Sequence, residues 1–64
     1  MFTVNFQTNN SGVEHSNQIF DSLLNAFNFM HSQVYTKNYV CGVVIDSDGE
    51  IVDRLYNLDN IHGF

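Results

Sequence analysis

The stretch YVCGVVIDSDGEIVDRLYNL, residues 39–58, decides the fold of this chain. Residues 39–45 and 51–58 are rich in β-branched and aromatic side chains, which favour strands. Between them, Asp48 and Gly49 form an Asp-Gly pair, which supplies the positive φ that a tight hairpin turn needs. The stretch therefore predicts an antiparallel hairpin.

Both faces of this hairpin are apolar. A two-residue turn at Asp48 and Gly49 pairs Ser47 with Glu50, Ile45 with Val52, Val43 with Arg54 and Cys41 with Tyr56. One face then carries Tyr39, Cys41, Val43, Ile45, Val52, Tyr56 and Leu58, and the other Val40, Gly42, Val44, Ile51 and Leu55. A one-sided antiparallel sheet would instead alternate apolar with polar side chains.

A single helix covers only one of these faces, and the other would leave an apolar patch larger than soluble monomers usually show to water. We therefore expect a second protein surface to cover it. The alternative is internal cover by the N-terminal strand, by the loop near His15 and by Ile61 and Phe64.

The N-terminal segment also shows strand alternation. Phe2, Val4 and Phe6 alternate with polar residues, which is typical of a strand with one buried face. A turn is expected over residues 9–12, which read NNSG. Residues 13–20 favour a polar edge strand, although Ser11 and Glu14 have the spacing of a helix capping box.

A helix is predicted from Ser22 onward, with Asp21 or Ser22 as its N-cap. At 100° per residue, an apolar stripe forms the expected core face, with Leu24 to one side of it and Phe29 to the other. The stripe consists of Leu23, Ala26, Phe27, Met30 and Val34. We expect Phe29 to be at least partly exposed, and His31 to lie on the last helical turn, where its imidazole favours the negative end of the helix dipole.

Together these elements predict an α+β, two-layer fold over residues 1–64 as a single compact domain. The sheet is small and antiparallel, with three or four strands in ββαββ or βαββ order. One amphipathic helix packs on one of its faces.

The charge of the chain excludes two classes of partner. Its 64 residues contain two basic and seven acidic side chains, a net of −5, and five of the acids lie in residues 46–64. Direct binding to nucleic acid or to an anionic membrane needs clusters of Lys and Arg, which are missing. With one cysteine, no signal-like N-terminus and no spanning apolar segment, we expect a cytoplasmic protein.

Catalytic and metal sites are not expected, and neither is a cofactor. An EF-hand register based on Gly49 would place its ligands on Val44 and Leu55, which cannot bind calcium. The three histidines, His15, His31 and His62, are too scattered for a spaced zinc pair. Cys41 lies inside a β-branched run, where a cysteine is usually a small buried hydrophobe.

The leading functional hypothesis is a non-catalytic protein interaction module that binds a larger protein and modulates it by inhibition, either alone or as a homodimer. Its contact residues would be the large, stiff aromatics that are enriched at binding hot spots. These are Phe29, Tyr35, Tyr39 and Tyr56.

The alternative is an acidic decoy that occupies the nucleic-acid groove of a host enzyme. In size, acidity and build the chain is similar, in a general way, to phage or plasmid inhibitors of restriction or CRISPR enzymes. The carboxylates that would stand in for phosphates are Asp46, Asp48, Glu50 and Asp53, with Asp59 behind them. A third class, a structural homo-oligomer or a subunit of an assembly, shares the two-faced sheet.

Overall fold

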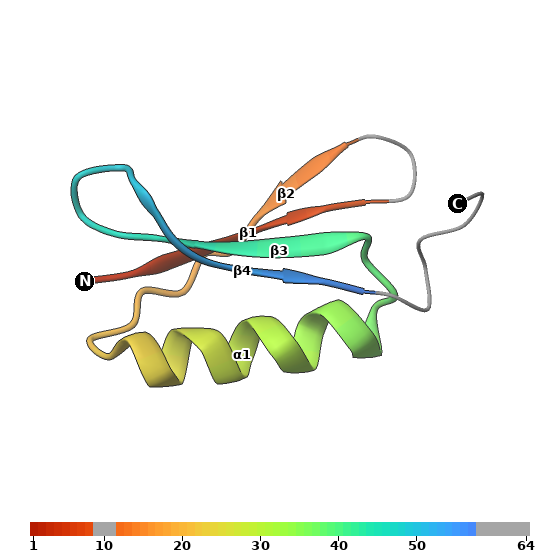
Figure 1. Cartoon of the computed structure of the whole chain (residues 1–64), viewed down its shortest axis with the longest axis horizontal. Helices are drawn as coiled ribbons and strands as arrows, with labels where there is room; N and C mark the ends of the chain where they lie inside the picture. Colours follow the sequence, from red (N-terminus) through yellow and green to blue (C-terminus); the bar gives the residue numbers. More distant parts are fainter. Residues whose placement is uncertain (9–11, 58–64) are drawn as a thin grey trace.

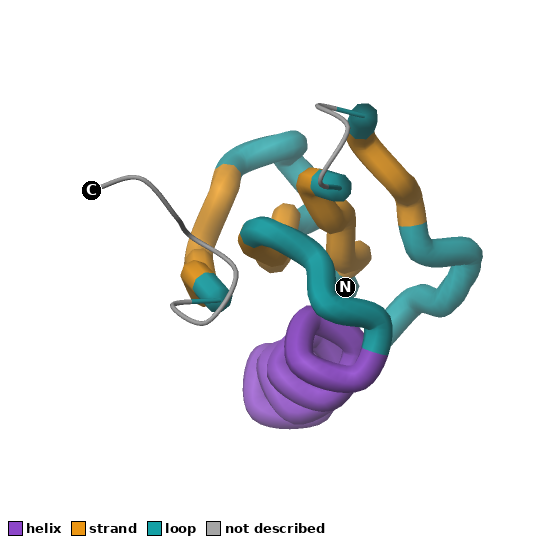
Figure 2. Tube along the Cα trace, turned by 90° about the vertical axis from the view of Figure 1, so that its right-hand side faces the viewer, coloured by secondary structure: helices purple, strands orange, loops and turns teal. Residues whose placement is uncertain are grey.

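The computed structural model describes residues 1–8 and 12–57 (Figure 1). Its elements are, in chain order, β1 (Thr3–Gln7), β2 (Val13–His15), α1 (Leu23–Thr36), β3 (Cys41–Ile45) and β4 (Ile51–Tyr56). The strands form one antiparallel sheet in the order β2-β1-β3-β4. The helix packs on one face of this sheet (Figure 2). This confirms the predicted two-layer α+β fold, with four strands in ββαββ order.

The core lies between α1 and the two central strands. Val4 and Phe6 of β1 and Val44 of β3 are buried, and so are Ala26, Met30 and Val34 of the helix. The predicted alternation of the N-terminal strand is therefore confirmed. Gly42 of β3 lies directly under the helix, where an added Cβ would stand 2.7 Å from Cγ of Met30.

The second strand is shorter than predicted. Only Val13–His15 pairs with β1, and residues 16–19 form no regular element. Phe20 returns to the sheet through an isolated bridge to Phe2, with both backbone bonds at 2.8 Å. The edge strand that was expected over residues 13–20 is therefore confirmed for residues 13–15 and wrong for residues 16–19. Residues 9–11 of the predicted preceding turn lie outside the described residues.

The hairpin turn is one residue longer than predicted. Asp46 N donates to Glu50 O at 2.9 Å and Gly49 N donates to Asp46 O at 3.1 Å, so three residues form the loop. Gly49 has φ 84°, the left-handed conformation typical of the last residue in such a loop. The side-chain oxygen Oδ1 of Asp46 also accepts the amides of Asp48 and Glu50 and stabilises the turn.

A register shift in the hairpin compensates for the longer turn. Val43 still pairs with Arg54 and Cys41 with Tyr56, as predicted, but Ile45 pairs with Ile51. The extra residue is Val52, because Val44 pairs with Asp53. The shift moves Ile51 to the same face as Ile45, so its predicted place beside Val44 is wrong.

The helix begins where it was predicted to begin. Ser22 is its N-cap, with an extended backbone and a side-chain oxygen that accepts the Asn25 amide at 3.3 Å. Most of the predicted stripe is confirmed, because Ala26, Met30 and Val34 are buried and Phe27 packs against the core; only Leu23, at 40% exposed, departs from it. Phe29 is partly exposed, as predicted, and its ring packs against those of Phe6 and Phe20. The Phe2–Phe20 bridge brings the Phe20 ring to this side of the helix.

The helix extends beyond the turn that contains His31, which was predicted to be its last turn. It continues to Thr36, and Asn38 follows in the left-handed conformation with φ 56°. Tyr39 N then donates to Val34 O at 3.0 Å, which closes the helix in the manner of a Schellman motif. His31 therefore lies in the middle of α1 on an exposed position, and the expected capping role is wrong.

Candidate protein-binding face

The face of the sheet opposite α1 carries a row of apolar side chains. Directly opposed residues of antiparallel strands point to the same face, and Val4, Phe6, Gly42 and Val44 face the helix. The residues between them on the same strands therefore point away from the helix. We call this surface the open face and define it by Asn5, Gln7, Val13, Cys41, Val43, Ile45, Ile51, Arg54 and Tyr56.

A shallow apolar groove runs across the open face. Its volume is about 270 Å³, and side chains from all four strands line it, chiefly Val13, Cys41, Val43, Ile45 and Ile51. Both β2 and the turn between β3 and β4 rise from the sheet on the side away from the helix (Figures 1 and 2). The groove therefore lies between two raised walls.

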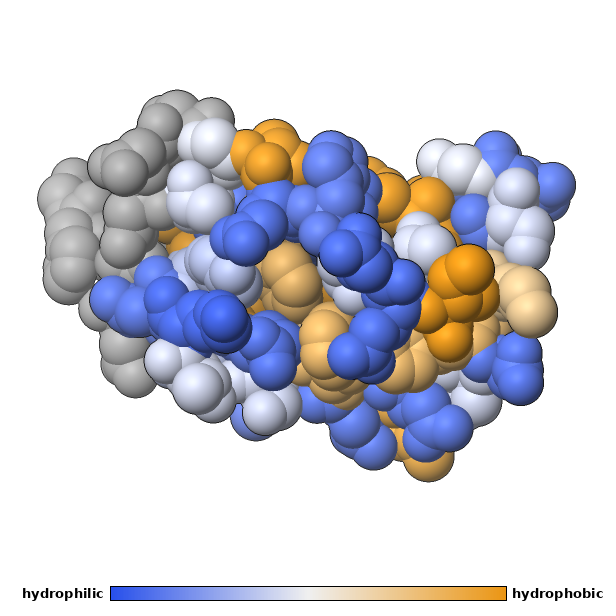
Figure 3. Space-filling model, turned by 180° about the vertical axis from the view of Figure 1, so that it is seen from behind, coloured by the Kyte–Doolittle hydropathy of each residue, from blue (hydrophilic) through white to orange (hydrophobic). Residues whose placement is uncertain are grey.

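The large side chains of the open face are accessible to water in the described part of the chain. Ile51 is 51% exposed, Tyr56 48% and Val13 63%, while Cys41, Val43 and Ile45 are half-buried. Seen from behind, hydrophobic surface also appears along the upper edge of the molecule, the edge opposite the helix (Figure 3). Polar groups flank the apolar residues: His15 Nδ1 lies 2.9 Å from Asn5 Oδ1, and Arg54 Nη1 donates to the Tyr56 hydroxyl at 3.3 Å.

Three segments were the alternatives for covering this face from within the chain. The N-terminal strand does not fold over it, because β1 is built into the middle of the sheet. The segment near His15 is edge strand β2, which forms a wall of the groove. Leu58, Ile61 and Phe64 lie outside the described residues.

The four aromatic side chains predicted as contacts do not form one surface. Tyr56 lies on the open face, whereas Phe29 packs at the edge of the core, with its ring 5.1 Å from that of Phe20. Tyr35 is 42% exposed on the helix, and its ring lies 5.0 Å from that of His31.

Tyr39 lies on the helix side of the sheet rather than on the predicted face. Its ring stacks on Phe6 with centroids 4.8 Å apart, and its hydroxyl donates to Glu14 Oε2 at 2.6 Å. The hydrogen bond to Glu14, burial and the negative charge of Glu14, in that order, raise the pKa of Tyr39. The predicted alternation fails here because β3 begins only at Cys41, after the left-handed Asn38.

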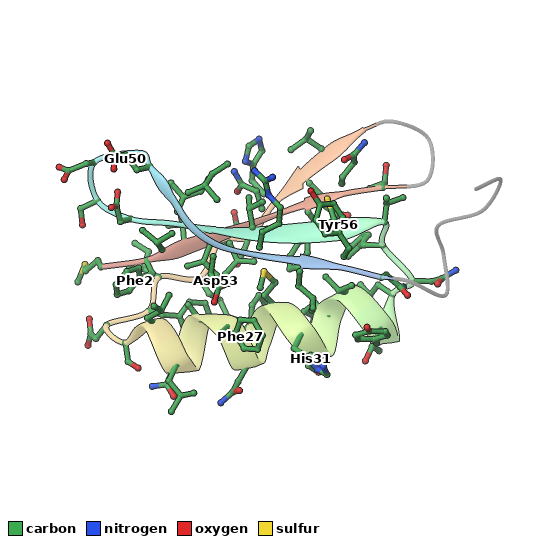
Figure 4. All side chains as sticks on the ribbon, viewed as in Figure 1. Phe2, Phe27, His31, Glu50, Asp53 and Tyr56 are labelled. Carbon is green, nitrogen blue, oxygen red and sulfur yellow. The ribbon has the colours of Figure 1, made fainter. Side chains whose placement is uncertain are left out.

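The predicted acidic residues are divided between two places. Asp46, Asp48 and Glu50 lie at the hairpin turn, and Figure 4 shows Glu50 at its tip. Asp53 instead points toward the helix, where it lines a second groove with Leu23, Leu24 and Phe27. A single row of phosphate-like carboxylates from the turn to Asp53 is therefore not formed. Asp59 lies outside the described residues.

Two residues of the open face were missed as site residues. The predicted pairing of Arg54 with Val43 places Arg54 on this face, so the sequence contained the signal. Ile51 reaches the face only through the register shift at Val52, which no local pattern shows. Cys41, Val43 and Ile45 were assigned to this face but not to a binding role, and Val13 was assigned to the edge strand without a face.

Within residues 1–8 and 12–57, no group of three or more His, Cys, Asp or Glu side chains could hold a metal ion. In the same ranges, no helix has the length and apolar character needed to cross a membrane. The chain matches no known protein-family model, no curated protein and no solved structure.

Proposed function

We propose that this chain is a non-catalytic protein interaction module that binds and inhibits a larger protein through its open face. The observation that carries the proposal is the groove of the open face, an apolar surface on the side of the sheet that α1 leaves uncovered. Groups of half-exposed aliphatic side chains with polar neighbours are typical of protein-binding surfaces. Tyr56 and Arg54 at one side of the groove belong to the residue types that dominate binding energies.

The acidic decoy is the weaker proposal. It rests on Asp48 and Glu50, which are exposed at the turn. The other two described carboxylates of the decoy hypothesis are not presented in the same way. Asp46 accepts two backbone amides, and Asp53 faces the helix. The apolar contacts of the open face and the acidic contacts of the turn respond differently to salt, which separates the two proposals.

The test is affinity capture from the native host with matched variants. Ile51→Asp places a charge on the open face, and Leu24→Asp places the same charge on an equally aliphatic, 67% exposed position of the helix. We expect one retained protein that survives 0.5 M NaCl, binds wild type and Leu24→Asp, and is lost with Ile51→Asp. Circular dichroism establishes that both variants fold.

The opposite pattern would contradict the proposal. A partner that Leu24→Asp loses and Ile51→Asp retains would move the binding surface to the helix. A partner that salt and Asp48→Asn together release, but Ile51→Asp does not, would favour the decoy.

A further inference from the structure

The charges of this chain are sorted by face. Among the described residues, the open face carries Arg54, with His15 at its edge, and no carboxylate. The chain has only one other basic residue, Lys37, at the far end of the helix. The acidic turn, which we define as residues 46–50, adjoins the open face at the end of the hairpin and carries three carboxylates.

Arg54 and the acidic turn lie on opposite sides of one apolar pair. Ile45 and Ile51 are directly opposed, and Arg54 follows Ile51 by three residues on β4. At about 3.3 Å per residue, roughly 10 Å separates Arg54 from this pair along the strand. The tip of the turn lies at a similar distance on the other side, two to three residues away.

This arrangement is self-complementary. A two-fold axis through the Ile45–Ile51 pair stacks the apolar residues of two copies on each other. The same rotation places Arg54 of each copy over the acidic turn of the other. The turn bends away from the helix toward this side, which brings it closer to a facing copy (Figures 1 and 4).

The groups needed for these contacts are accessible. Among the described residues, the carboxylates of Asp48 and Glu50 have no hydrogen-bond or ion-pair partner. The turn itself is held in place, since Asp46 accepts two of its amides and Ser47 Oγ donates to Met1 O at 3.2 Å. A fixed turn presents its charges without a large loss of conformational entropy.

Pairing through the free edge of β4 is less favourable than pairing through the face. Asn57 N donates to Val40 O, so by the alternation of antiparallel ladders the amide of Arg54 points outward from the sheet. Asp53 Oδ1 already accepts that amide at 2.8 Å. The edge therefore lacks one of the donors that strand addition would use.

We infer that, in the absence of the larger protein, the open face is occupied by a second copy of this chain, with Arg54 of each copy paired to the Asp48 and Glu50 carboxylates of the other. The inference rests on the proposed function, in that it takes the open face to be a protein-binding surface. The four strands lie about 4.8 Å apart; three of them are about 17 Å long and β2 is about 10 Å long, so together they offer roughly 300 Å² in projection. This is well below the standard interface of about 800 Å² per partner, so we expect a weak, transient dimer.

The inference is tested by reversing the charge on each side of the proposed contact and then mixing the two variants. Sedimentation velocity from 2 to 500 µM gives the association state of wild type, Arg54→Glu and the double variant Asp48→Lys with Glu50→Lys. Each variant alone brings only like charges together, so we expect at least tenfold weaker dimers. An equimolar mixture of the two variants restores both attractive contacts and returns the dissociation constant to near the wild-type value.

Lys37→Glu is the matched control, because it makes the same charge change as Arg54→Glu at an exposed position away from the open face. We expect it to leave the dimer unchanged. A dimer that does not respond to the charge reversals, or that Lys37→Glu weakens as much as Arg54→Glu does, would overturn the inference.

Cys41 reports separately on whether the face is free. Its thiol is half-buried in the groove, with Sγ 3.5 Å from Gln7 Oε1, and it is the only cysteine of the chain. We expect the rate of its reaction with a small disulfide reagent to fall several-fold as the protein concentration rises through the dissociation constant. A monomer whose Cys41 reacts readily at every concentration overturns the dimer and leaves the proposed function standing. A monomer whose Cys41 reacts only in denaturant has an internally covered face, and this overturns both.

Discussion

Asn57 Nδ2 lies 3.4 Å from Val34 O and 3.2 Å from Asn38 Oδ1, which joins the end of β4 to the end of α1. Asn57 is the one buried polar side chain among the described residues, with 1% of its surface exposed. Its amide therefore stabilises the helix C-terminus from a distant part of the sequence.

Replacing Asn57 with Ala removes both donors and opens a small cavity beside the helix end. We expect the free energy of unfolding to fall by about 1–3 kcal/mol. Urea denaturation followed by circular dichroism measures the change. Asn28→Ala, on the exposed side of α1, is the control and should change stability by no more than about 0.5 kcal/mol. Equal effects of the two substitutions would show that the Asn57 contacts contribute nothing.

Gly42→Ala tests the close approach of α1 to β3. The added methyl group would meet Met30 Cγ at 2.7 Å and Val34 Cγ2 at 3.0 Å, so we expect a loss of about 1–3 kcal/mol in stability. In the double variant with Met30→Ala, the clash with Met30 is absent. The two losses should then sum to more than the loss of the double variant, because the residues share one space. Strict additivity would argue against the contact.

The turn predicts a different response at Gly49. Its φ of 84° is costly for most side chains, although an added Cβ would meet no atom within 4 Å. Gly49→Ala should therefore reduce stability by about 1–2 kcal/mol through the backbone alone. Gly49→Asn should cost less, since Asn tolerates the left-handed region. Thermal unfolding of the two variants gives the comparison, and a more stable Ala variant would contradict it.

The Tyr39–Glu14 hydrogen bond predicts a pH dependence. The pKa of Tyr39 is raised above its ordinary value of 10.0, first by the hydrogen bond to Glu14, then by burial and by the Glu14 charge. The folded state thus holds this proton more tightly than the unfolded state does. The resulting stabilisation is complete below pH 10 and is lost as the pH rises through the raised pKa.

Absorbance at 295 nm follows the ionisation of the three tyrosines. We expect a component above the ordinary tyrosine range that Tyr39→Phe removes and Glu14→Gln shifts to lower pH. Tyr35→Phe is the control, because no hydrogen bond to a carboxylate holds that hydroxyl among the described residues. A high component that survives Tyr39→Phe would belong to another residue.

The sequence predicted most of the fold because its signals are local. Period-2 alternation placed β1, the β-branched runs placed β3 and β4, and the hydroxyl of Ser22 marked the helix start. The pairing of Val43 with Arg54 followed from the Asp-Gly turn even though the turn length was wrong. The error of one residue in the loop is cancelled by the extra residue Val52 on β4.

The candidate site was less predictable because it depends on distant contacts. Whether Tyr39 lies on the open face is decided by its stacking on Phe6, 33 positions earlier in the chain. The partial burial of Phe29 depends in the same way on Phe20, whose bridge to Phe2 brings its ring beside Phe29. Neither relationship leaves a periodic signal.

The sequence alone was sufficient to predict a two-layer fold that ends in a hairpin with two apolar faces. This is because hydrophobic spacing and turn chemistry act over a few residues. Packing in three dimensions chose which side chains share the open face, through the shift at Val52 and the left-handed Asn38. The same packing decided that the helix covers the face of Asp53 and leaves the face of Arg54, its neighbour in the chain, open. Successive side chains of a strand alternate between faces, so the sheet itself sorts their charges.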